Sequence, residues 1–223
     1  MLWYHRAVNA CMAGTSPTTI DVEPIWDALD RAARARLERY AKLVESYRDV
    51  ARLTGAGTLA EIRDVLVRES LALVPFIREL APGEVADLGS GAGVPGIPLA
   101  GALPEVGFTL YERSERKASF LEIAVSTLGL SNVKVAAWDP LVERELQRFP
   151  CVTMRSVVPV GRLADIAKKM LAAGGRLMGF VSAETGKRLA EEVAPALRVD
   201  RLGAYKGAGG TSFVYSLAMG GQR

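Results

Sequence analysis

The residues of this chain that could do chemistry are a cluster of glycines and two acids. Residues 85–100 read V-A-D-L-G-S-G-A-G-V-P-G-I-P-L-A, and their four glycines are Gly89, Gly91, Gly93 and Gly96. Glycine loses the most backbone freedom on folding, so this density indicates a chain that turns sharply and admits a close ligand. Asp87 lies just before the cluster, and Glu112 ends the next apolar run. Free N–H groups at the start of a following helix suit a nucleotide-like ligand.

The same residues fit two classes of cofactor. Gly91-Ala-Gly93-Val-Pro-Gly96 matches the G-x-G-x-x-G pattern of dinucleotide sites, and Glu112 lies at roughly the 20-residue distance of a ribose-binding acid. From Asp87 onward, however, an acid inside a strand followed by G-x-G-x-G is typical of S-adenosylmethionine-dependent methyltransferases. In those enzymes an acid at the position of Glu112 also accepts hydrogen bonds from the ribose hydroxyls.

Three features favour the methyl donor without excluding the dinucleotide. Asp87 has no role in the dinucleotide pattern, whereas a carboxylate near a cationic sulfonium is electrostatically favourable. The single histidine, His5, lies near the N-terminus, so the histidine acid–base of many dehydrogenases is missing from the rest of the chain. No length remains for a separate substrate domain. An NAD(P)-dependent oxidoreductase stays the less favoured alternative.

The elements that must position these residues alternate between strand and helix from residue 84 onward. The predicted strands are 84–88, 107–112, 133–137, 151–154, 175–181, 197–204 and 212–218. The predicted helices between them are 94–103, 114–128, 162–172 and 184–194. This alternation predicts an α/β fold with a doubly wound sheet. Ligands of such sheets bind at the carboxyl ends of strands where strand order reverses, which is where the glycine-rich loop belongs.

The region before this sheet divides into two further segments. We expect residues 1–20 to be a tail and 21–80 an N-terminal helical cap, followed by a cofactor-binding methyltransferase domain over 81–223. Apolar residues at helical spacing, such as Leu37, Tyr40 and Val44, support the cap. A second helix is predicted over 59–80, and Pro75 should kink or end it.

Composition limits the classes of function. The chain is 49% hydrophobic and 24% charged, as expected of a soluble globular protein. Its two cysteines cannot form a disulfide framework, so we expect a reducing, cytoplasmic location. No apolar run reaches the roughly 18 residues of a membrane span, and no metal-binding motif is present. A net charge of +3 permits a polyanionic partner. We expect a monomer with no metal and no membrane partner.

The half-motif G-V-P-G-I-P-L-A closely resembles the loop of one family, the small-subunit ribosomal RNA guanine-N7 methyltransferases, also called glucose-inhibited division protein B. Further matches flank it over roughly residues 49–183. They are Leu53-Thr54, Glu61-Ile-Arg63-Asp64, Glu69-Ser-Leu-Ala-Leu73, Phe108-Thr-Leu-Tyr-Glu112, Arg116-Lys117, Phe120-Leu121, Leu128-Gly-Leu-Ser-Asn132 and Thr153-Met-Arg155-Ser156. Arg155 lies where the family has the arginine of an S-R-A motif.

The resemblance implies a class I methyltransferase: a Rossmann-like, mostly parallel sheet with helices on both faces, one late antiparallel strand and an N-terminal helical extension. It implies S-adenosylmethionine-dependent methylation of N7 of a guanine in 16S ribosomal RNA, on the RNA or the assembling small subunit. The expected cofactor-binding residues are Asp87, Gly89, Gly91, Gly93, Val94, Glu112, Asp139, Pro140, Leu141 and Arg155. Arg155 is also the expected catalytic residue, with a plain surface ion pair as its alternative. Trp138 is expected to stack on a base or pack in the core, and Asp139 to bind adenine or cap a helix.

Several departures mark this chain as a diverged member. Leu66 stands where the family has a histidine, and Phe180-Val181-Ser182 replaces a segment with a lysine and a glycine. Trp138-Asp139 replaces a small residue and Glu. A catalytically inactive RNA- or ribosome-binding relative is therefore the second alternative.

Overall fold

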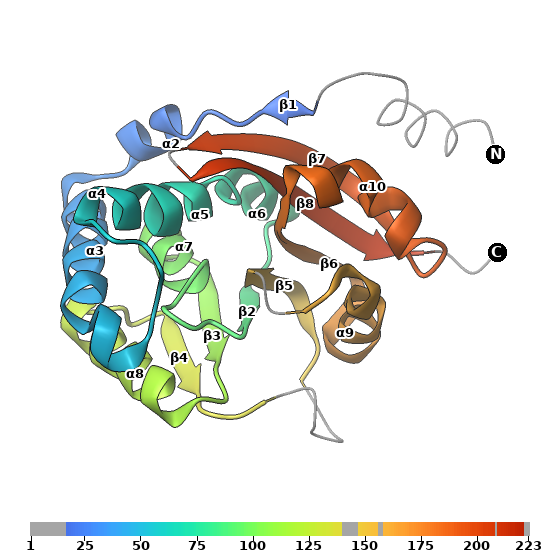
Figure 1. Cartoon of the computed structure of the whole chain (residues 1–223). Helices are drawn as coiled ribbons and strands as arrows, with labels where there is room; N and C mark the ends of the chain where they lie inside the picture. The colour runs from blue at the N-terminus through green and yellow to red at the C-terminus, as the bar shows by residue number, and fades with distance from the viewer. Residues whose placement is uncertain (1–16, 140–146, 156–157, 208, 221–223) are drawn as a thin grey trace.

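The computed structural model describes residues 17–139, 147–155, 158–207 and 209–220 (Figure 1). Its strands are β1 Thr18–Thr19, β2 Glu84–Leu88, β3 Gly107–Tyr111, β4 Val133–Ala136, β5 Phe149–Arg155, β6 Leu171–Ser182, β7 Leu197–Gly207 and β8 Gly210–Met219. The helices of the first half are α2 Glu23–Ala28, α3 Arg31–Ala51, α4 Leu59–Ile62, the π-helix η1 Arg63–Arg68, α5 Glu69–Leu71, α6 Val74–Leu80 and α7 Gly96–Ala102. Those of the second half are α8 Glu115–Leu128, the 3₁₀ turn η2 Val160–Arg162, α9 Leu163–Met170 and α10 Ala183–Val193.

The strands form one sheet in the order β1-β7-β8-β6-β5-β2-β3-β4. Strand β8 runs antiparallel to both of its neighbours, and every other pairing in this sheet is parallel. The predicted doubly wound α/β sheet with one late antiparallel strand is therefore confirmed. The chain adds β3 and β4 on one side of β2 and β5 on the other, so strand order reverses at β2. Parallel sheets bind ligands beyond the carboxyl ends of the strands at such a point.

Side chains of the central strands alternate between two cores. Val85 and Cys151 face a core shared with α3, α5, α6, α7 and α8, whereas Ala86 and Val152 face the core under α9 and α10. Figure 1 shows these two groups of helices on opposite sides of the sheet. Period-2 alternation of buried residues in a strand requires both faces to be covered, which confirms helices on both faces.

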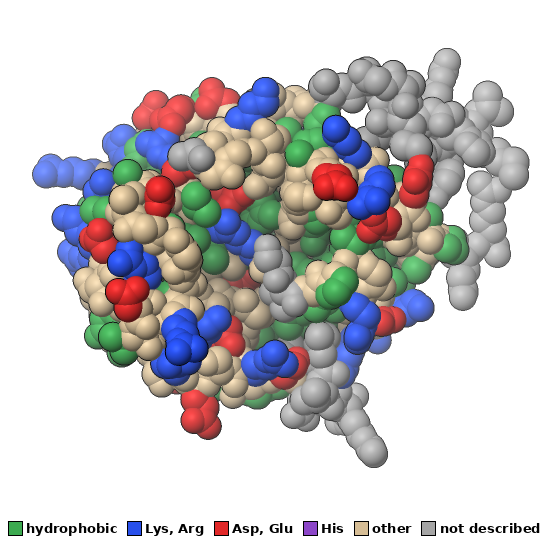
Figure 2. Space-filling view, in the orientation of Figure 1, with side chains coloured by type: hydrophobic (Ala, Val, Ile, Leu, Met, Phe, Trp, Pro, Cys, Tyr) green, Lys and Arg blue, Asp and Glu red, His purple; other side chains and the backbone are tan. Residues whose placement is uncertain are grey.

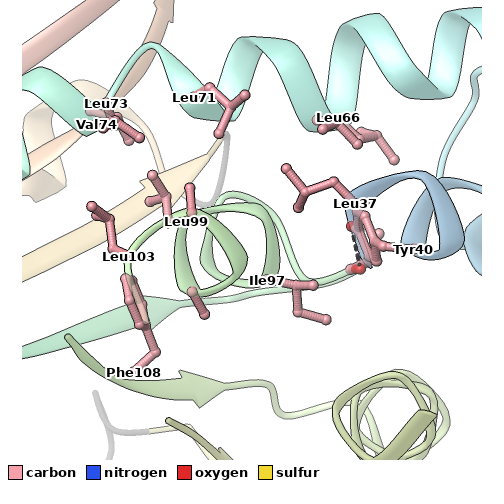
Figure 3. Close-up of a cluster of buried hydrophobic side chains, with 14 of the residues drawn as sticks. Leu37, Tyr40, Leu66, Leu71, Leu73, Val74, Ile97, Leu99, Leu103 and Phe108 are labelled. Carbon is pink, nitrogen blue, oxygen red and sulfur yellow. Dashed lines mark hydrogen bonds between the residues drawn. The ribbon is translucent and has the colours of Figure 1, made fainter. Parts of the chain in front are cut away.

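The predicted helical cap shares the core of the sheet. Leu37 and Tyr40 of α3 are buried and lie between Leu66 of η1 and Ile97 of α7 (Figure 3). The Tyr40 hydroxyl also donates a hydrogen bond of 2.8 Å to the Ala92 carbonyl in the glycine-rich loop. The N-terminal helices therefore support the loop directly.

Two details of this N-terminal region bear on the sequence-based expectations. Thr18 and Thr19, expected in the tail, form a short edge strand parallel to β7. The helix predicted over 59–80 is interrupted before Pro75, which lies in the first turn of α6. A proline costs little there, because the N–H groups of a first helical turn have no partner within the helix. The predicted interruption near Pro75 is thus confirmed, and Pro75 itself lies at the start of the helix that follows.

Candidate functional site

A cavity of about 500 Å³ lies beyond the carboxyl ends of the central parallel strands. Its lining comes mainly from the segments that follow β2, β3, β4 and β5. Leu53, just past the end of α3, and Lys117 of α8 complete part of the wall. The cavity therefore lies where strand order reverses, as the sequence analysis predicted for the glycine-rich loop.

The glycines of this loop have two different structural roles. Gly89, Gly91 and Gly93 have φ angles of 65°, 57° and 95°, in the left-handed region that favours glycine. A Cβ on Gly91 would have no neighbour closer than 3.8 Å, and Gly91 lines the cavity. A Cβ on Gly93 would lie 2.4 Å from Ile97 Cδ1 in the core. Gly91 therefore keeps the cavity open, whereas Gly93 lets the loop pack against α7.

Glu112 joins the loop after β3 to the glycine-rich loop. Its Oε2 accepts a hydrogen bond of 2.9 Å from the Gly91 N–H, and its Oε1 accepts one of 2.8 Å from the Ser114 N–H. The residue is only 7% exposed, but it lines the cavity. A carboxylate can accept about four hydrogen bonds, so each oxygen retains capacity for a ligand hydroxyl.

Asp87 lies behind the loop and does not line this cavity. It is fully buried, and its carboxylate accepts hydrogen bonds from the Gly96 N–H at 3.2 Å and the Thr153 hydroxyl at 2.9 Å. Burial raises the pKa of Asp87 to about 6, against the opposing effect of its hydrogen bonds. Asp87 thereby connects β2 to β5 and to the first turn of α7, while its contact with a cofactor stays a prediction.

Arg155 ends β5 and reaches across to the N-terminal helices. One terminal nitrogen donates a hydrogen bond of 2.6 Å to the Val65 carbonyl in η1, and the other lies 2.6 Å from Glu69 Oε2. The Arg155 side chain is 19% exposed and that of Glu69 is 6% exposed. The expected alternative, a plain surface ion pair, does not describe this largely buried contact beside the cavity.

The segment after β4 supplies Trp138 and Asp139 to the cavity wall. The Trp138 ring packs edge-on against Tyr111, with ring centroids 5.0 Å apart, yet 39% of the residue remains exposed. Of the other expected cofactor-binding residues, Gly89 and Val94 line the cavity and Gly93 does not. Pro140 and Leu141 lie outside the described residues.

The comparisons with known proteins decide the family. A family model described as "rRNA small subunit methyltransferase G" matches residues 33–197. This chain belongs to that family. A relative from Sorangium cellulosum, named ribosomal RNA small subunit methyltransferase G, is 37% identical over 172 residues, which are 75% of this chain and 70% of the relative. A relative of the same name from Stenotrophomonas maltophilia is 34% identical over 163 residues, 73% of this chain and 76% of the relative. The resemblance found in the sequence is confirmed.

Solved structures agree on the fold. A putative O-methyltransferase from Klebsiella pneumoniae superposes with a TM-score of 0.56 at 11% identity and covers 99% of both chains. Magnesium protoporphyrin IX methyltransferase from Synechocystis, solved with bound S-adenosylmethionine, superposes with a TM-score of 0.55 at 17% identity over 85% of this chain and 97% of that one. The class I methyltransferase fold is confirmed, and membership of a methyltransferase family sets the oxidoreductase alternative aside.

Two cations that were not among the expected site residues also lie at the site. Arg113 and Lys117 both line the cavity. Neither forms a salt bridge within the part of the chain that the structure describes. The signal in the sequence was their position one and five residues past Glu112.

Two of the departures from the family pattern have structural roles here. Leu66 is buried, 4% exposed, in the core between η1 and α3 (Figure 3). Ser182 caps α10, because its side chain accepts a hydrogen bond of 3.1 Å from the Thr185 N–H. Among the described residues, no group of metal-ligating side chains is found, and no helix is long and apolar enough to cross a membrane.

Proposed function

We propose that this family member transfers a methyl group from S-adenosylmethionine to N7 of a guanine in 16S ribosomal RNA. The observation that carries this proposal is the wall of the cavity at the reversal of strand order. It combines Gly91, which presents no side chain, with Glu112, whose carboxylate is held by the backbone of the loop. The names of the relatives, ribosomal RNA small subunit methyltransferase G, supply the substrate class.

The residues of the cavity fit the cofactor. A volume of about 500 Å³ is within the usual range for a cofactor of this size. Glu112 would accept hydrogen bonds from the ribose hydroxyls, Asp139 would accept one from the adenine amino group, and the backbone at Gly89 and Gly91 would lie along the ligand. Val94 and Arg155 line the same cavity, and Pro140, Leu141 and the structural residues Asp87 and Gly93 complete the proposed set. When bound, the cofactor supplies an electrophilic methyl group.

The reaction requires little acid–base catalysis by the protein. Guanine N7 carries a lone pair and no proton, so no general base is required. What the chain must do is bind the base, align it and exclude water, and such positioning can contribute several kcal/mol. A guanidinium has five N–H donors; one terminal nitrogen of Arg155 donates to the Val65 carbonyl, and the other forms an ion pair with Glu69. The remaining donors can hold O6 of guanine or a phosphate.

The RNA would bind through local cations near the cavity. Arg113 and Lys117 are suitable phosphate ligands, since both line the cavity. Figure 2 shows basic and acidic side chains interspersed over this face, in keeping with a net charge of only +3. Binding to isolated RNA should therefore be weak and sensitive to salt, and the folded small subunit should be the better substrate. The protein would act as a cytoplasmic monomer.

Two experiments test this proposal in turn. Calorimetry with S-adenosylhomocysteine and with NAD tests the cofactor, and we expect binding of the first alone. Transfer of labelled methyl from S-adenosylmethionine to unmodified small subunits tests the reaction. Cofactor binding without transfer to any ribosomal fraction would support the alternative function, a catalytically inactive RNA- or ribosome-binding protein. The buried Leu66, which stands in place of the family histidine, favours that alternative. Label on a protein or small molecule instead of RNA would contradict the substrate.

A further inference from the structure

Arg155 lies between two cavities, and its contacts on one side leave donors for the other. The larger cavity, of about 500 Å³, is the proposed cofactor site. The smaller one, of about 80 Å³, lies between η1 and the end of the β7–β8 hairpin, and Asp64, Glu69 and Tyr205 contribute to its wall. Arg155 lines both. Whatever holds its guanidinium therefore decides which donors face the proposed reaction site.

Two groups on neighbouring helical segments hold that guanidinium. The Val65 carbonyl accepts a hydrogen bond of 2.6 Å from one terminal nitrogen, and Glu69 Oε2 lies 2.6 Å from the other. Both holding groups come from one stretch, the π-helix η1 and the first residue of α5. π-helical segments are rare and frequently occur at functional sites. The hydrogen bond to Val65 and the ion pair with Glu69 together restrict rotation of the planar guanidinium.

We propose that Glu69 is a positioning residue, which fixes Arg155 so that its remaining N–H donors face the substrate. This inference rests on the proposed function. A buried ion pair is weak evidence for a stabilising role, because desolvation of the two charges offsets much of their attraction. Glu69 is 5% exposed and begins a helical segment of only three residues, so α5 itself does not require a charge at this position. Orientation of Arg155 is what the carboxylate provides.

The other charged and polar groups around the small cavity are engaged with one another. The Tyr205 hydroxyl donates a hydrogen bond of 2.7 Å to Asp64 Oδ1, which joins β7 to η1. A Cβ on Gly207 would lie 2.6 Å from Asp64 Oδ2, so the hairpin approaches η1 closely. Among the described residues around the small cavity, Glu69 is thus the carboxylate that forms an ion pair with Arg155.

The test compares Glu69→Gln, which keeps the shape but removes the charge, with Glu69→Asp, which keeps the charge on a shorter side chain. The control is Asp200→Asn, since Asp200 and Arg176 form a similar, partly buried pair on β6 and β7. We expect Glu69→Gln to bind S-adenosylhomocysteine within threefold of wild type but to lose at least tenfold in kcat/KM for methyl transfer to small subunits. Glu69→Asp should recover part of this loss, and Asp200→Asn should transfer at the wild-type rate.

A double-mutant cycle with Arg155→Ala separates positioning from a structural role. If Glu69 acts through Arg155, Glu69→Gln should add less than a further twofold loss in the Arg155→Ala background. Equal losses in both backgrounds, or full activity of Glu69→Gln, would overturn the inference. If Glu69→Gln fails to fold, the same double-mutant cycle with Glu69→Asp tests whether Glu69 acts through Arg155. Absence of transfer by wild type would instead contradict the proposed function, so the two failures are distinguishable.

Discussion

Gly91 and Gly93 lie two residues apart in the same loop but have different surroundings. Gly91 lines the cavity, and a Cβ there would meet no atom closer than 3.8 Å, whereas a Cβ on Gly93 would collide with Ile97. At the scale of single residues, the motif therefore combines ligand access with packing of the loop. The sequence shows only that both positions are glycine. Their separate roles depend on the direction of each missing Cβ, which follows from the φ angles of the folded loop.

Substitution of these two glycines should separate binding from stability. We expect Gly91→Leu to abolish binding of S-adenosylhomocysteine in calorimetry, at a cost of about 1–2 kcal/mol in the free energy of unfolding for its left-handed backbone. Gly93→Ala should lower the free energy of unfolding by more, because its Cβ must displace the Ile97 side chain. Denaturant unfolding measures both. A Gly91→Leu protein that binds the cofactor like wild type would show that the site is misplaced.

Glu112 offers a second test at the residue scale. Glu112→Gln removes the charge and replaces one accepting oxygen with an NH₂ group, which cannot accept the N–H of Gly91 or Ser114. We expect the dissociation constant for S-adenosylhomocysteine to rise at least tenfold, since hydrogen bonds to charged groups contribute about 1.5–3 kcal/mol each. Calorimetry on the Glu112→Gln and Asp139→Asn variants would show which of the two acids contributes more to the affinity for S-adenosylhomocysteine. A Glu112→Gln variant with wild-type affinity would remove Glu112 from the site.

At the scale of elements, the site depends on contacts between segments far apart in the sequence. Asp87 of β2 binds Thr153 of β5, a pairing set by the register Asp87↔Thr153 between these parallel strands. Strand propensity and spacing predicted both strands but not that they are neighbours, because strand order is a property of the sheet. The same limit applies to Glu69 and Arg155, which the resemblance matched separately and only the fold brings into contact.

The buried Asp87 should give stability a pH dependence of known sign. Its pKa of about 6 in the folded protein lies above the ordinary value of 3.8, so the folded state favours the protonated form. The contribution of Asp87 to the free energy of unfolding is therefore greatest below pH 4 and falls as pH rises toward 6 and slightly beyond. Between pH 5 and pH 7 we expect this contribution to the free energy of unfolding to fall by about 1.4 kcal/mol, which corresponds to one pKa unit.

The measurement is the free energy of unfolding of wild type and Asp87→Asn at several pH values in this window. Subtracting the variant removes the titration of every other group that the two proteins share. The difference should shift by the stated amount between pH 5 and pH 7. A difference that stays constant with pH would show that Asp87 is ionised throughout the window.

The contact between α3 and the glycine-rich loop makes a separate prediction. Tyr40→Phe removes the hydroxyl that donates to the Ala92 carbonyl and leaves that carbonyl buried without this partner. We expect a loss of about 1–3 kcal/mol in the free energy of unfolding, together with weaker cofactor binding, because Ala92 lines the cavity. Tyr47→Phe on the same helix is the control, since Tyr47 packs against Phe120 through its ring. Equal effects of the two substitutions would contradict a role for the hydroxyl.

At the scale of the whole molecule, alternation of strands and helices was enough to predict the sheet and the side of it that carries the site. The prediction of a late antiparallel strand came from the family resemblance. Nothing in the composition of residues 210–219 distinguishes this strand from a parallel one. The sequence also predicted a separate helical cap, but in the fold Leu37 and Tyr40 of that segment share one core with Ile97 of α7. Amphipathic spacing identifies a buried face without identifying what covers it.

In the proposed reaction, this chain places guanine N7 of 16S ribosomal RNA against a methyl donor in the cavity at the reversal of strand order. The most direct measurement is transfer from labelled S-adenosylmethionine to unmodified small subunits, followed by borohydride–aniline cleavage of the RNA at any N7-methylguanine. We expect cleavage at a guanine with the wild-type protein and none with Gly91→Leu. Labelled RNA that resists cleavage, or equal cleavage with Gly91→Leu, would contradict this proposal.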